Sequence, residues 1–143
     1  MMTEKTNKTK LSIILGIISL VLLVGGEICH IISDHWPDVL QESDWYYLTV
    51  FIGWIFVLFA DYLRPVTTKR DMENASWNYF VIIIAMGFIC IIQVFKIQHF
   101  TAPMIAALII ASILAILGCI LSYRKWLGIK AQLENQENEK NPE

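Results

Sequence analysis

The chain has 143 residues, of which 56% are hydrophobic and only 17% are charged. This length is enough for one compact unit and too short for a second folded domain. The formal net charge of -2 gives no indication of nucleic-acid binding. Charged residues gather at the ends and in short gaps between long apolar runs, which indicates a protein whose main solvent is lipid.

Four apolar runs are long enough to cross a membrane, because a crossing helix needs about 20 mostly apolar residues. The helices are expected at residues 11–32, 45–63, 77–97 and 102–123. They form a transmembrane domain over residues 11–126, between an N-terminal segment at 1–10 and a polar tail at 127–143. The tail is expected to continue the last helix only briefly before becoming disordered. The sequence therefore predicts an all-α, polytopic membrane protein with a four-transmembrane-helix bundle.

Basic residues occur before the first run, between the second and third runs, and after the fourth. They include Lys5, Lys8, Lys10, Arg64, Lys69, Arg70, Arg124, Lys125 and Lys130. The first loop, by contrast, carries four acidic residues (Asp34, Asp38, Glu42 and Asp44) and no lysine or arginine. Because short cytoplasmic loops are enriched in lysine and arginine, this pattern predicts a multi-pass protein of the cell membrane with both termini in the cytoplasm.

Each predicted helix has one face of small or polar residues. The small residues expected to mediate helix packing are Gly16, Ser19, Gly26, Gly53, Ala107, Ala111, Ala115 and Gly118. Lipid supplies no hydrophobic force between helices, so small residues that let two backbones approach closely favour their association. These faces are expected to pack within the bundle, against another copy of the chain, or in both ways.

Ionisable residues inside the apolar runs are a sharper signal. Glu27 lies beyond the centre of the first run, and His30 follows one turn later on the same face. The third run has the opposite direction, so Gln93 and Lys96 reach a similar depth, with His99 just beyond. A carboxylate in lipid costs about 2.5–3.5 kcal/mol on insertion scales, so Glu27 is expected to find a partner. We predict a polar cluster of these five residues near the outer surface.

Two interpretations of this cluster are open. Glu27 is either a proton or cation site, as in a small transporter, or half of a structural pair with Lys96 or His30 that fixes two helices in register. In architecture alone, the chain resembles the small multidrug transporters, which have four short helices and a membrane-embedded glutamate in the first. It departs from them in its longer acidic first loop, its charged tail, and a glutamate nearer the outer face.

No constellation for catalysis is evident. No serine or cysteine has both a base and an orienting acid nearby, and there is no glycine-rich phosphate loop. The spacing of Glu27 and His30 matches one half of a carboxylate di-metal site, but the second half is missing. The three cysteines lie in apolar runs without a metal-binding spacing. We therefore expect neither a metal nor another cofactor.

The leading hypothesis is a non-enzymatic accessory, regulatory or immunity-type component. Such a protein would act in the lipid bilayer by helix packing, either with itself as a homo-oligomer or with a membrane protein partner. The alternative is a small proton-coupled transporter or oligomeric channel that uses the intramembrane Glu27.

Overall fold

The computed structural model describes residues 2–36 and 44–140. Within these residues all regular secondary structure is helical, and four helices are long and apolar enough to cross a membrane. The predicted all-α class with four membrane-length helices is therefore confirmed. Two of the acidic residues of the first loop, Asp38 and Glu42, lie outside the described residues.

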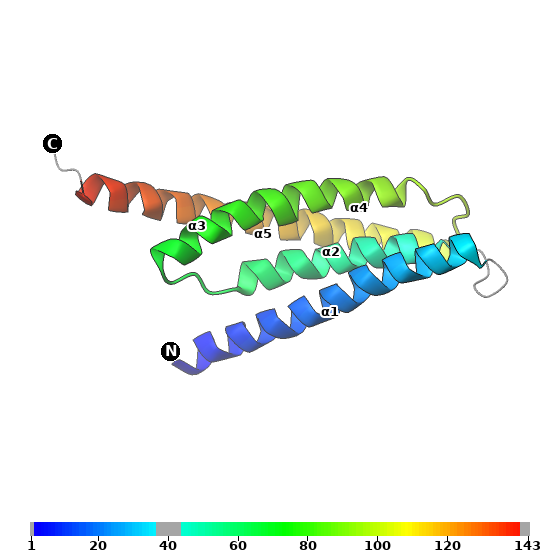
Figure 1. Cartoon of the computed structure of the whole chain (residues 1–143), viewed down its shortest axis with the longest axis horizontal. Helices are drawn as coiled ribbons and strands as arrows, with labels where there is room; N and C mark the ends of the chain where they lie inside the picture. Colours follow the sequence, from blue (N-terminus) through cyan, green and yellow to red (C-terminus); the bar gives the residue numbers. More distant parts are fainter. Residues whose placement is uncertain (1, 37–43, 141–143) are drawn as a thin grey trace.

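These four membrane-length helical segments, termed crossings below, run along one common direction, each antiparallel to the one before (Figure 1). The first is α1 (Met2–His35) and the second is α2 (Trp45–Leu63). The third is built from three consecutive pieces: α3 (Lys69–Asn78), the π-helical stretch η1 (Tyr79–Ala85) and α4 (Met86–Val94). The fourth is α5 (Ala102–Lys140). Both chain termini and the α2–α3 connection lie at one end, the termini end, while the α4–α5 connection lies at the far end (Figure 1).

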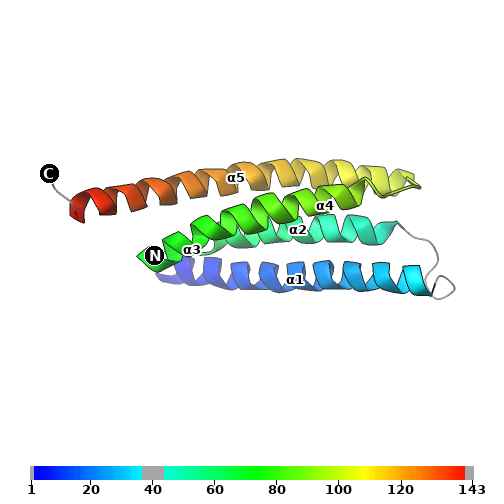
Figure 2. The same cartoon turned by 45° about the horizontal axis from the view of Figure 1, so that its top comes forward.

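Helix α2 is the centre of the bundle, since it contacts α1, α4, η1 and α5. Six of the ten residues in the described core belong to α2, and Leu58 among them is fully buried. By contrast, α1 contacts α2 alone among the helices of the described structure. Figure 2 shows α1 along the edge of the bundle rather than inside it.

Glycines let the neighbouring helices approach α2. An added Cβ on Gly26 would lie 2.6 Å from the Val50 side chain, and one on Gly53 would lie 3.0 Å from Leu23. On α5, a Cβ on Gly118 would lie 3.0 Å from Leu58. These three glycines therefore lie at close helix contacts, as small residues do in membrane bundles. Gly16 differs, because an added Cβ there would meet nothing within 4 Å.

The other predicted packing residues also lie along these contacts. Ala111 and Ala115 are buried in the core beside α2, and Ala107 packs against it. Ser19 is buried as well, but its hydroxyl donates to the Gly16 carbonyl oxygen of its own helix at 2.7 Å. The small-residue face of α5 therefore serves contacts within this chain.

The third crossing is anchored on α2 by one tryptophan. The Trp54 indole is 3% exposed, and its Nε1 donates to the Ile82 carbonyl oxygen at 3.2 Å. Ile82 belongs to η1, where the backbone hydrogen bonds are shifted to a π-helical pattern. A Cβ on Gly87, just beyond η1, would lie 2.5 Å from the Trp54 ring, so only glycine leaves room for the indole.

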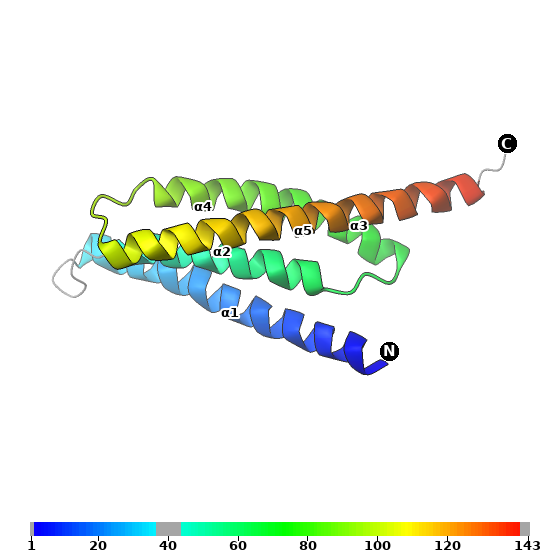
Figure 3. The ribbon, with the colours of Figure 1, turned by 180° about the vertical axis from the view of Figure 1, so that it is seen from behind.

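Helices α1 and α5 are longer than the crossings expected at 11–32 and 102–123. With 34 and 39 residues, they span about 51 Å and about 58 Å, against a hydrocarbon core of about 30 Å. The extra length of α5 projects beyond the bundle at the termini end (Figure 3). The expected bounds counted apolar residues only, whereas a helix also continues through polar sequence that has high helix propensity.

The polar tail is therefore helical as far as Lys140, rather than only briefly. Its Ile129 is buried, as is Met72 on α3, and α3 contacts α5. The indole Nε1 of Trp126 donates to the Ser76 hydroxyl oxygen on α3 at 3.1 Å. Packing against α3 therefore supports this segment as far as Ile129. The residues beyond it are mostly exposed, and their alanine, leucine, glutamine and glutamate side chains favour a helix by themselves.

Candidate functional site

The five polar residues expected to cluster lie toward the far end but do not form one network. Among the described residues, no hydrogen bond or ion pair joins any two of these side chains. Two of them, His30 and His99, instead make contacts with other residues, while three have polar groups without a hydrogen-bonding or ionic partner. The structural pairs considered for Glu27, with Lys96 or with His30, are not formed within the described chain.

His30 lies in the contact between α1 and α2. Its Nε2 is 3.6 Å from the Asp34 carboxylate one turn later on the same helix. Its ring lies 5.2 Å from that of Tyr46 and 5.4 Å from that of Tyr47, measured between centroids. These contacts make His30 part of an aromatic packing group between the first two helices.

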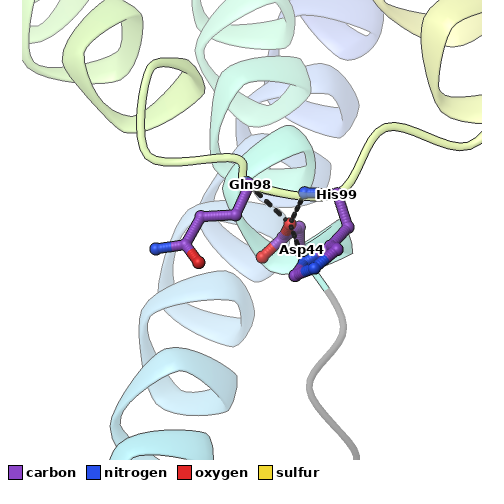
Figure 4. Close-up of polar contacts among 3 residues, drawn as sticks. All are labelled: Asp44, Gln98 and His99. Atoms are coloured by element: carbon purple, nitrogen blue, oxygen red, sulfur yellow. Dashed lines mark hydrogen bonds and ion pairs between the residues drawn. The ribbon is translucent and has the colours of Figure 1, made fainter.

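His99 lies at the far end, beside Asp44 (Figure 4). One carboxylate oxygen of Asp44 accepts hydrogen bonds from the backbone N–H groups of Gln98 and His99, at 2.9 and 2.8 Å. The same oxygen is 3.9 Å from His99 Nδ1, although the His99 side chain is 82% exposed. Asp44 thus immediately precedes α2 and, through its side chain, fixes the α4–α5 connection to that helix.

Glu27 has an exposed side chain on α1. It makes no hydrogen bond or ion pair with any described residue. On α4, the Cys90 thiol is buried, with its Sγ 4.0 Å from the Val50 carbonyl oxygen of α2.

Gln93 and Lys96 also have unused hydrogen-bonding groups. The side-chain oxygen Oε1 of Gln93 is buried and receives no hydrogen bond in the described structure. The Lys96 side chain is exposed, and its ammonium has no partner among the described residues. A buried acceptor without a donor is costly, so the Gln93 oxygen is an unusual feature of this region.

The opposite side of α1 borders an apolar cavity of about 620 Å³ between α1, α2 and α5. Leu11 and Leu15 line it from α1, Phe59 from α2, and Leu114 from α5. Every residue that lines it is apolar, so this cavity suits lipid chains and offers no group for chemistry.

At the termini end, Lys125 of α5 binds the C-terminal end of α2. Its Nζ donates to the backbone carbonyl oxygen of Asp61 and, at 2.9 Å, to that of Arg64. The last carbonyl groups of a helix lack partners within the helix and carry partial negative charge. Lys125 therefore supplies hydrogen-bond donors and a positive charge at the C-terminal end of α2, and it joins the second and fourth crossings.

Sequence reasoning missed Gly87, Asp44 and Lys125 as structural residues. An isolated glycine inside a helical run, such as Gly87, is a recognisable signal of a close contact. Nothing in the sequence shows which backbone groups Asp44 and Lys125 reach, since their partners lie more than 50 residues away.

Comparison of the chain with models of known protein families, with curated protein sequences and with solved structures gives no significant match. The geometry of the far-end polar residues and of α1 is therefore the basis of the functional proposal.

Proposed function

We propose that the chain is a small, non-enzymatic membrane protein that acts by binding. It would be an accessory, regulatory or immunity-type component that assembles through helix packing, with a partner membrane protein or with further copies of itself. The observation that carries this proposal is the uncovered side of α1, which has an ionisable residue among large apolar ones.

Apolar residues alone would not support this proposal, because lipid covers them as well as protein does. Leu20, Val24 and Ile31 are 61%, 48% and 52% exposed, and lipid suffices for each of them. Glu27 is different, since a carboxylate facing lipid is costly and intramembrane ionisable residues usually have a partner or a function. Within the described residues α1 contacts α2 alone, so such a partner would come from outside these residues.

The proposed location is the cell membrane, with the termini end in the cytoplasm. Both termini and the α2–α3 connection lie at this end, and these are the segments in which basic residues gather (Figure 1). Lys96 is the one lysine or arginine outside these segments. The positive-inside rule supports this orientation.

The proposal is tested by native mass spectrometry of the protein extracted gently from its own membranes. We expect a complex larger than one chain, either a closed homo-oligomer or a stable complex with another membrane protein. A monomer under conditions that preserve known membrane complexes of the same preparation would contradict the proposal. Turnover of a lipid or peptide by the purified chain would contradict it as well.

The alternative is a small proton-coupled transporter or oligomeric channel, and the same exposed Glu27 favours it. A carboxylate without a partner in the chain can exchange a proton or a cation. This alternative predicts that Glu27→Gln abolishes flux in proteoliposomes while expression and assembly are unchanged. Equal flux from the wild-type protein and this variant would remove Glu27 from any transport role.

A further inference from the structure

Two acceptor groups in the far half of the molecule have no donor in the described structure. The Glu27 carboxylate on α1 makes no hydrogen bond or ion pair, and the Gln93 side-chain oxygen on α4 is buried without a partner. A buried polar atom without a partner is rare in folded proteins, and a carboxylate without a partner on an apolar helix is costly in lipid. These two groups in one region therefore point to a donor from outside the described residues.

Glu27 lies on the flank of α1 that faces away from the apolar cavity. Successive residues of a helix are rotated by about 100°, so positions can be compared around its axis. Gly26 marks the direction of α2, and Leu11 and Leu15 mark the direction of α5. Glu27 is about 100° beyond Gly26, on the side opposite these leucines.

Gln93 lies on the matching flank of α4. Cys90 marks the direction of α2, because its Sγ lies near the Val50 carbonyl oxygen. Ile91 and Phe95 line the cavity between α4 and α5, and both lie on one side of Cys90 around the helix. Gln93 is about 60° from Cys90 on the other side, which is the side of α1. The two acceptors therefore belong to the same side of the bundle, with α2 between their helices.

We propose that this side of the bundle binds a transmembrane helix of a partner protein that carries a lysine or arginine at the depth of Glu27. The inference rests on the proposed function and names the chemistry of its partner. The ammonium or guanidinium group donates to the exposed Glu27 carboxylate and, once the partly exposed Gln93 side chain turns its amide oxygen outward, to that oxygen as well. Helix α1 and helix α4 do not contact each other in the described structure, so neither covers the other's flank beside α2.

The surroundings of the two acceptors favour a helix over a metal ion. Leu20, Val24 and Ile31 lie on or near the flank of Glu27 and are exposed. A partner that covers this side of the bundle would therefore be mainly apolar. A hard cation such as Ca²⁺ takes six to eight oxygen ligands, whereas this side offers one carboxylate and one amide. No group of three His, Cys, Asp or Glu side chains in the described residues is arranged to hold a metal.

A basic partner is also favoured over a second copy of the chain. Lys96 is the one lysine or arginine near the far end that a second copy would supply. It lies beside the connection that binds Asp44, whereas Glu27 lies at the level of Val50. Six residues of α2 separate these levels, which is about 9 Å along the helix. A lysine near a membrane surface extends toward water, away from Glu27.

The experiment captures a model partner in membranes by photo-crosslinking. The full-length chain carries a photoreactive residue at Leu20, two turns before Glu27 on the same flank, or at Cys29, on the opposite flank. It is co-expressed with one of two leucine-rich single-pass helices. The lysine helix has one lysine at the depth of Glu27, and the leucine helix has leucine at that position. We expect capture of the lysine helix from Leu20 but not from Cys29, and little capture of the leucine helix.

Matched variants test whether capture depends on the Glu27 carboxylate and on the Gln93 side-chain oxygen. Glu27→Gln keeps the shape and should reduce capture of the lysine helix about tenfold, because it removes the charge that the ammonium meets. Gln93→Leu should reduce it about threefold, the effect of one interhelical hydrogen bond. Asp34→Asn removes a carboxylate two turns away on the same helix and should leave capture unchanged.

The other outcomes overturn the inference or the proposed function separately. Equal capture of the lysine and leucine helices, or full capture by Glu27→Gln, would overturn the inference. Crosslinks between two copies of the chain at Leu20, with the lysine helix ignored, would overturn it while the proposed function stands. Capture that follows the expected pattern, from a chain that is monomeric in its native membranes, would support the site and overturn the proposed function.

Discussion

Helices α1 and α2 pack against each other along their length, yet their environments are opposite. In the most apolar 18-residue stretch of each, 39% of α2 is buried and 11% of α1. Of the four membrane-length helices described, α2 has the lowest mean hydropathy and the largest buried share. In water the most apolar helix would be expected inside, but lipid removes that preference. The interior position of α2 therefore comes from close contacts and polar pairing, which hydropathy does not measure.

The polar groups of the two helices show the same contrast. The Trp54 indole of α2 donates to the third crossing, and the Asp61 carbonyl oxygen near the C-terminal end of α2 accepts from Lys125 of α5. The carboxylate of Asp44, just before α2, accepts from the α4–α5 connection. On α1, Ser12 donates its hydroxyl to the Ala60 carbonyl oxygen of α2 at 2.7 Å, but Glu27 has no such partner. We infer that α2 organises the fold and that α1 is the helix that faces a binding partner.

The largest effect is expected from Trp54→Ala, which removes the main contact between α2 and the third crossing. We expect a loss of about 3 kcal/mol in the free energy of unfolding, the low end for large-to-small core changes because lipid removes the transfer term. The control is Val21→Ala on the exposed side of α1, which should change stability very little. Unfolding by SDS titration in mixed micelles measures both. Equal losses would show that α1 is as tightly packed as α2.

A smaller loss is expected from Gly87→Leu, which places a side chain where the Trp54 ring lies. Overpacking of this kind costs about 2 kcal/mol. Gly16→Leu is the matched control on α1, because an added Cβ there meets nothing within 4 Å. The same SDS titration should separate the two variants clearly. A stable Gly87→Leu protein would mean that the third crossing moves easily relative to α2.

These two positions also show how far the sequence predicts the fold. The bounds of α2 and the existence of four crossings follow from apolar runs of membrane length, since backbone satisfaction in lipid allows little else. The close contacts at Gly26, Gly53 and Gly118 follow from small residues on one helix face. The central position of α2 and the packing of Trp54 against the third crossing do not follow from the sequence, because they depend on which helix faces meet and on the π-helical stretch η1.

The candidate site was harder to predict for a related reason. Residues at similar depth on different helices were expected to meet, but depth does not give the direction of a side chain around its helix. His30 turns toward two tyrosines, and His99 lies beside Asp44, while Glu27 and Gln93 remain without donors. The helical extension of α5 was missed because its polar sequence was weighed without its contact with α3 and without its helix propensity.

A moderate effect is expected from Lys125→Met, which keeps the length of the side chain but removes the ammonium from the end of α2. Hydrogen bonds to charged groups contribute about 1.5 kcal/mol or more, so we expect a loss of about that size. Arg124→Met changes the neighbouring, exposed basic residue and should be nearly neutral. Amide hydrogen exchange at the end of α2 provides a local measurement, and it should quicken in Lys125→Met alone. Unchanged exchange would mean that other groups satisfy these carbonyls.

The smallest effect on stability is expected from Glu27→Gln. The side chain is exposed and has no hydrogen-bonding or ionic partner in the described chain, so the free energy of unfolding should change by less than about 0.5 kcal/mol. The partner-bound complex should nevertheless weaken, which native mass spectrometry of the same preparation would detect. This combination, a neutral fold and a weakened complex, distinguishes a binding residue from a structural one. A loss of about 2 kcal/mol in the isolated chain would instead show that Glu27 is paired internally, and α1 would then belong to the scaffold together with α2.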